Sequence, residues 1–181
     1  MLDIDVVRKI IKNAVVSIKQ DSDGEIIEKT WQRIIFYLLF YILPILLAIV
    51  VWINNIYLTD MEGYLGTGIA IFTGLFFSLL LTIGSKIKAE KENVNVDQFA
   101  LEKYKNNMRQ ISHIVLYVIL LGIFIFIIML ANSIFTIEYS NVLAKLLTSI
   151  AIFLLVQFIV ALFFILQRFY FLVFDEINNI L

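Results

Sequence analysis

The chain has 181 residues, a formal net charge of −1 and no cysteine, and 61% of its residues are hydrophobic. A chain without cysteine can form neither a disulfide framework nor a thiolate metal site. No basic stripe of the kind that binds nucleic acid is present, so we expect no direct nucleic-acid binding. The apolar excess is typical of a membrane protein.

The first twenty residues predict a separate amphipathic helix. Apolar residues recur at three- and four-residue spacing, and charged residues occupy much of the other face. Two roles fit this pattern: a helix on the membrane surface or against a partner, and a helix packed beneath its own bundle. The segment lacks the continuous apolar core of a cleaved signal peptide. The apolar positions are Val7, Ile10, Ile11, Ala14, Val15 and Ile18.

Four long apolar runs follow, and none of them contains Asp, Glu, Lys or Arg. A helix needs roughly 20 apolar residues to cross roughly 30 Å of hydrocarbon. The sequence therefore predicts an all-α, polytopic membrane protein with an N-terminal segment (1–33) and a four-helix transmembrane domain (34–181). The runs are Ile34–Ile53, Tyr64–Ile83, Ile114–Ala131 and Leu146 to about Leu166.

Pro44 lies near the middle of the first run. Proline removes a backbone donor and kinks a helix, and such kinks are tolerated in membranes when neighbouring groups satisfy the freed carbonyl. We expect a static kink and keep a gating hinge as the alternative.

Small residues recur every four positions in the second run, at Gly66, Ala70, Gly74 and Ser78. A stripe of this kind lets helix backbones approach closely, which is a main route to association in lipid. We favour packing within the chain and keep a contact between copies as the alternative.

The hydrophilic stretch 86–112 separates the second and third runs. Residues 88–92 extend the second helix, 93–97 form a break, and Asp97 is placed to cap a helix that leads into the third run. We predict a helical hairpin beyond the bilayer, either a protein-facing surface or a solvated turn.

Three polar residues mark the last two runs. Gln157 is the only strongly polar side chain deep in the fourth run, and it fits an interhelical hydrogen bond or a polar ring around a pore. His113, the only histidine, is expected to be an interfacial polar residue and not a base. Arg168 could snorkel to the headgroups.

Lys and Arg residues are distributed very unequally among the loops. Six precede the first run, six lie between the second and third runs, and one follows the fourth, whereas the two other loops carry only Lys145. Because positively charged loops stay cytoplasmic, we predict that both ends of the chain are cytosolic.

Several mechanisms are disfavoured by what the runs lack. Proton-coupled transporters need an ionisable group within the membrane, and an intramembrane hydrolase needs a nucleophile–base pair or a metal cluster. We therefore expect no catalytic residue, no metal ligand, no cofactor and no enzymatic activity.

Residues 36–44 (FYLLFYILP) and 73–81 (TGLFFSLLL) resemble the membrane subunit of the Kiwa anti-phage defence system. The resemblance covers the four-span plan, and no functional residue is carried over from it. It implies a homo-oligomeric, tetrameric sensor in the bacterial inner membrane that recruits a soluble cytosolic effector. The alternative is a small oligomeric ion channel that depolarises the membrane.

Overall fold

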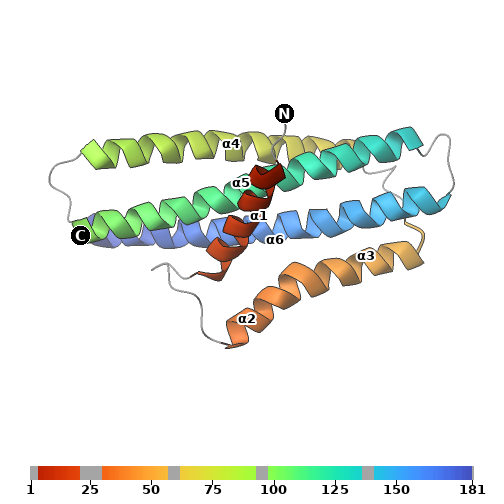
Figure 1. Ribbon diagram of the computed structural model, residues 1–181, viewed down its shortest axis with the longest axis horizontal. Coiled ribbons are helices and arrows are strands. Elements are labelled where there is room, and N and C mark those ends of the chain that lie inside the picture. The colour runs from red at the N-terminus through yellow and green to blue at the C-terminus, as the bar shows by residue number, and fades with distance from the viewer. Residues whose placement is uncertain (1–3, 21–29, 57–61, 93–97, 136–140, 181) are drawn as a thin grey trace. The chain divides into compact units, whose positions relative to one another are not determined.

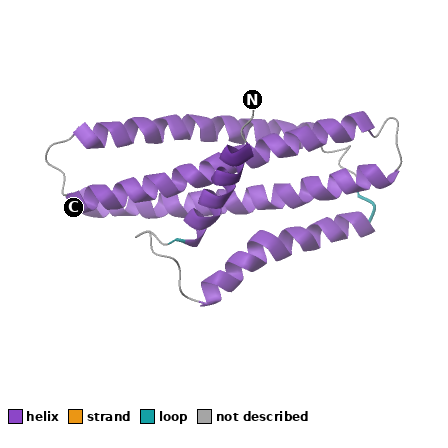
Figure 2. Cartoon of the chain, viewed as in Figure 1, coloured by secondary structure: helices purple, strands orange, loops and turns teal. Residues whose placement is uncertain are grey.

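The computed structural model of the chain describes residues 4–20, 30–56, 62–92, 98–135 and 141–180. Within these ranges every regular element is a helix, as Figures 1 and 2 show. The predicted all-α class is therefore confirmed for the described part of the chain. The elements are α1 (Ile4–Lys19), α2 (Thr30–Tyr37), the π-helix η1 (Leu38–Ile42), α3 (Leu43–Ile53), α4 (Glu62–Glu92), α5 (Gln98–Phe135) and α6 (Asn141–Ile180).

Four helical segments are long and apolar enough to cross a membrane, as predicted. They are Ile34–Ile53, Gly63–Ile83, Lys105–Ile134 and Val142–Tyr170. The first two match the predicted runs to within one residue. The last two extend beyond them, because a helix continues through polar residues at which an apolar run ends.

The chain forms two compact units, and α4, α5 and α6 each contribute a segment to both. Unit 1 comprises Met1–Arg33, Phe76–Tyr117 and Ala161–Leu181, and unit 2 comprises Ile34–Leu75 and Val118–Val160. The predicted cytosolic segment 1–33 thus belongs to a unit that also includes parts of three other helices. The predicted break at residues 93–97 lies outside the described residues.

In unit 1, α1 packs through the second half of its length. Ala14, Ser17 and Ile18 are buried, whereas Ile4 is 78% exposed and Ile11 is 39% exposed. Ile111 of α5, in the same unit, is fully buried. The prediction of a helix packed beneath its own bundle describes the end of α1, and its first turns remain accessible.

In unit 2, α4 and α5 approach closely at Gly122. A Cβ built on Gly122 would lie 2.7 Å from Thr73 Oγ1 and 3.2 Å from Ile69 Cγ2. A larger residue at this position would therefore require the side chains of Thr73 and Ile69 to move. This is the close contact between helices that small residues make possible in lipid.

The stripe of small residues on α4 lies away from this contact. Ala70, Gly74 and Ser78 are exposed, and a Cβ on Gly74 would meet nothing within 4 Å. Gly66 is half-buried, and its nearest contact is Met129 Cε at 4.0 Å from the built Cβ. Three of the four stripe residues are therefore exposed within the chain, and the role of the stripe in helix packing stays a prediction.

Candidate functional site

The carboxyl end of α1 is held by Arg168 of α6. The last carbonyl groups of a helix have no partner within it, and a cation near them also interacts favourably with the helix dipole. Arg168 Nη2 donates to the carbonyl oxygen of Ser17 at 3.3 Å and to that of Gln20. The sequence suggested a headgroup contact for Arg168, and the structure gives it this contact within the chain.

A second contact joins α1 to α5. The Ser17 hydroxyl and His113 Nδ1 share a hydrogen bond of 3.0 Å. A serine next to a histidine can be the core of a nucleophilic site. However, Ser17 is only 2% exposed, and no carboxylate among the described residues bonds to His113. The pair therefore joins α1 to α5 within unit 1.

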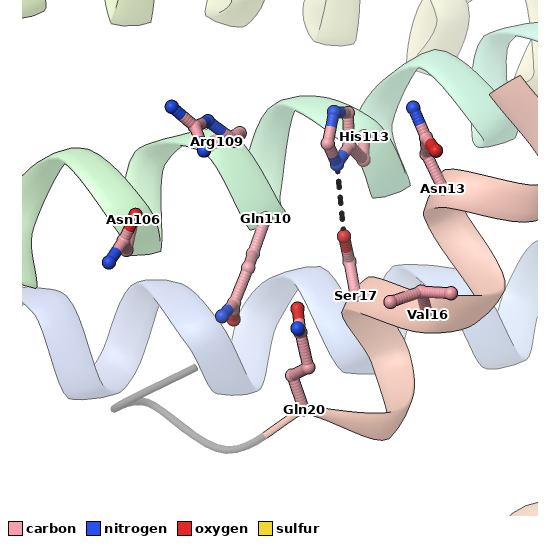
Figure 3. A pocket seen from close by; sticks show the side chains of 8 residues that line it. All are labelled: Asn13, Val16, Ser17, Gln20, Asn106, Arg109, Gln110 and His113. Atoms are coloured by element: carbon pink, nitrogen blue, oxygen red, sulfur yellow. Dashed lines mark hydrogen bonds between the residues drawn. The ribbon is translucent and has the colours of Figure 1, made fainter. Parts of the chain in front are cut away.

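A pocket of about 330 Å³ opens beside this junction (Figure 3). Its walls come from α1, the residue that follows α1, and α5, and seven of its eight lining side chains are polar. In Figure 3, Ser17 points toward His113, and Gln110 hangs from α5 toward Gln20. The pocket thus lies where α1 meets α5. The lining residues are Asn13, Val16, Ser17, Gln20, Asn106, Arg109, Gln110 and His113.

Two amide side chains are buried on the same stretch of α5. Asn107 is 9% exposed and Gln110 is 4% exposed. The Asn107 Oδ1 atom has no hydrogen-bond partner among the described residues. A buried polar atom without a partner costs free energy, so a further donor beside Asn107 would stabilise this part of α5.

Unit 2 holds a separate polar contact around Pro44. In an α-helix the N–H of residue 44 would donate to the carbonyl of residue 40, and proline has no N–H. Gln157 Nε2 of α6 donates to the Phe40 carbonyl oxygen at 3.2 Å. Both residues are buried, Phe40 at 1% and Gln157 at 7% exposure. The amide of one helix thus satisfies the carbonyl that proline frees in another.

The backbone around Pro44 departs from α-helical geometry. The π-helix η1 ends two residues before Pro44, and the Leu43 N–H donates to the Leu38 carbonyl oxygen. Short π-helical turns inside α-helices are frequent at functional sites. Of the two roles predicted for Gln157, the interhelical hydrogen bond is the one seen in the structure. Whether Pro44 is a hinge or a static kink stays a prediction.

Sequence reasoning missed Ser17 and its pairing with His113. A signal was present, because Ser17 lies one residue before Ile18 on the face of α1 that carries Ala14. A polar side chain on a buried face needs a hydrogen-bond partner. The choice of partner depends on how α1 is rotated against α5, which helical spacing does not fix.

Comparison with protein-family models, with curated proteins and with solved structures finds no match.

Proposed function

We propose that the protein is a non-enzymatic membrane sensor and scaffold in the bacterial inner membrane, in which α1 is a releasable docking element. The observation that carries the proposal is the clasp on α1, made by Arg168 and by the pair Ser17–His113. An isolated helix of 16 residues is marginally stable in water. The clasp therefore controls whether α1 is folded against the bundle.

The exposed surface of α1 supports a docking role. Arg8, Lys9 and Lys12 are exposed, and the first turns bury little apolar surface. A helix held mainly at one end can exchange between a docked and a released population, and a ligand or partner that prefers one of them shifts the balance.

The distribution of Lys and Arg supports a cytosolic location for α1. Because the chain has no cysteine, single cysteines introduced at Lys9 and Asp60 can be labelled with a membrane-impermeant maleimide. We expect labelling of Asp60→Cys in intact spheroplasts and of Lys9→Cys only after lysis. The reverse pattern would overturn the orientation.

We further propose a homo-oligomer, a tetramer as the resemblance implies, assembled through the stripe on α4. The exposure of Ala70, Gly74 and Ser78 supports it, as does the low burial of the Gly63–Ile83 segment, where 11% of the most apolar stretch is buried inside the chain.

A matched pair of variants tests the assembly. Gly74→Leu adds bulk to the stripe, and Gly68→Leu adds the same bulk on α4 outside the stripe, at another position where a Cβ meets nothing within 4 Å. We expect Gly74→Leu alone to lower the mass of the complex in native mass spectrometry. An unchanged mass for both variants would exclude the stripe as the interface.

The defence role and the soluble effector rest on the resemblance of residues 36–44 and 73–81. The test is protection of cells against phage by the chain expressed with its neighbouring genes, together with co-purification from native membranes. We expect Arg168→Gln to abolish both protection and effector recovery while the protein still inserts. Full protection of cells that express Arg168→Gln would show that the Arg168 contact is not needed for defence.

The alternative, a small ion channel, is favoured by the π-helix before Pro44, which could act as a gating hinge. Planar-bilayer recordings test it. Conductance that Gln157→Leu alters would support a channel, whereas silence of the wild type under voltage and membrane tension would exclude it.

A further inference from the structure

The pocket between α1 and α5 has the chemistry of an anion site. Four of its lining residues carry amides, which donate hydrogen bonds, and Arg109 contributes a guanidinium. No carboxylate is among its lining residues, and only Val16 is aliphatic. A cation would be repelled by Arg109, and an apolar ligand would form no hydrogen bond with the amides.

Arg109 is available to a ligand. Its side chain is exposed, and no hydrogen bond or ion pair joins it to another residue in the described part of the chain. A guanidinium presents a rigid fork of N–H donors that matches a phosphate or a carboxylate with two parallel hydrogen bonds. Arg109 is one helical turn from His113, which is already bonded to Ser17.

The position of the pocket along α5 favours phosphate. The Lys105–Ile134 segment has 30 residues, about 45 Å at the rise of an α-helix, and roughly 30 Å of that suffices to cross the hydrocarbon. Arg109 and Asn106 lie just before the apolar run that begins at Ile114. The pocket is therefore expected at the level of the headgroups, where phosphate groups are concentrated.

The volume of the pocket and the charges on α1 agree with a phosphate ligand. A volume of about 330 Å³ lies at the lower end of the range of roughly 300–1,000 Å³ for small-molecule sites. The exposed cations Arg8, Lys9 and Lys12 on α1 raise the local concentration of anions.

We propose that this pocket binds a phosphate monoester or diester, carried by an acidic phospholipid headgroup or by a soluble metabolite. Asn13 and Gln20 line the pocket from the α1 side, and Asn106 and Arg109 line it from α5. A ligand held from both sides stabilises the docked position of α1. The binding site stands whether or not α1 is a docking element.

The test uses the purified full chain in a neutral detergent with two kinds of probe. Short-chain phosphatidylglycerol, with phosphatidylcholine as the zwitterionic comparison, is measured by native mass spectrometry. Glycerol 3-phosphate is measured by isothermal titration. The variants are Arg109→Gln and Arg109→Lys, and the matched control is Arg8→Gln, an exposed cation on α1 outside the pocket.

Arg109→Gln is expected to weaken binding about tenfold or more, because it removes a charge-assisted pair of hydrogen bonds. Arg109→Lys should lose less, since the charge remains, and Arg8→Gln should change binding less than twofold. Tight retention of phosphatidylglycerol alone identifies a lipid as the source of the phosphate. Saturable binding of glycerol 3-phosphate identifies a soluble ester.

Binding of neither probe, or equal losses in Arg109→Gln and Arg8→Gln, would overturn the proposal. If Arg109→Gln does not yield a monodisperse protein, Asn106→Leu takes its place, because it removes an amide of the pocket and leaves every charge unchanged. Unaltered binding by Asn106→Leu would contradict the proposal in the same way.

Discussion

Arg168 and Gln157 make the same kind of contact in two regions of the molecule. Both belong to α6, and each donates to backbone carbonyl oxygens of another helix. Arg168 serves the end of α1 beside an open polar pocket, where water can take over the carbonyls. Gln157 donates to the Phe40 carbonyl oxygen at a position where both residues are buried. We therefore propose that the first contact is releasable, and we expect the second to persist as part of the fold.

The largest effect on global stability is expected for Gln157→Leu. It removes the buried hydrogen bond between Gln157 Nε2 and the Phe40 carbonyl oxygen, at a cost of about 1–2 kcal/mol. Unfolding in mixed detergent micelles measures this cost. Gln167→Leu is the matched control, the same substitution at an exposed position of α6, and a comparable loss in that variant would contradict the account.

Pro44→Ala should rescue Gln157→Leu in part. Alanine restores an N–H at position 44 and allows the π-helical turn to return to α-helical geometry, in which this N–H donates to the Phe40 carbonyl oxygen. We expect a coupling energy of about 1 kcal/mol between the two positions in a double-mutant cycle. Strictly additive effects would show that Gln157 does not compensate for Pro44.

Arg168→Gln should lower global stability by only about 1 kcal/mol. Hydrogen bonds that involve a charged group are worth about 1.5–3 kcal/mol, but the carbonyls of Ser17 and Gln20 become hydrated once α1 is released. The same micelle unfolding experiment applies. A loss larger than that of Gln157→Leu would remove the distinction between the releasable and the permanent contact.

Ser17→Ala should have the smallest effect, about 0.5 kcal/mol. It removes the hydrogen bond to His113, and the half-buried imidazole can turn to water. Thermal unfolding followed by circular dichroism measures it. An effect as large as that of Gln157→Leu would mean that the pair is part of the core.

The sequence determines the spans far better than the contacts between them. Ile34–Ile53 was predicted to the residue, because transfer of an apolar run into lipid outweighs every local preference. The third span was predicted too short at its start, since α5 continues as a helix through Lys105 and Arg109. Charged residues end an apolar run without ending the helix.

The contacts between helices were harder to predict, because they depend on rotations that the runs leave open. Pro44 and Gln157 were each singled out, and the rule that proline frees the carbonyl four residues earlier pointed to Phe40. Nothing in the spacing paired that carbonyl with Gln157. The stripe on α4 drew attention as a packing surface, whereas the close contact forms at Gly122, the only glycine in the third run.

The central claim, that Arg168 clasps a releasable α1, is tested most directly by hydrogen–deuterium exchange of residues 4–19. Wild type, Arg168→Gln and the control Arg8→Gln are compared in the same detergent, with residues 114–131 of α5 as the internal reference. We predict faster exchange throughout α1 in Arg168→Gln only, because a detached helix of this length is marginal in water, and no change in the reference. Equal protection of α1 in all three proteins would contradict the account.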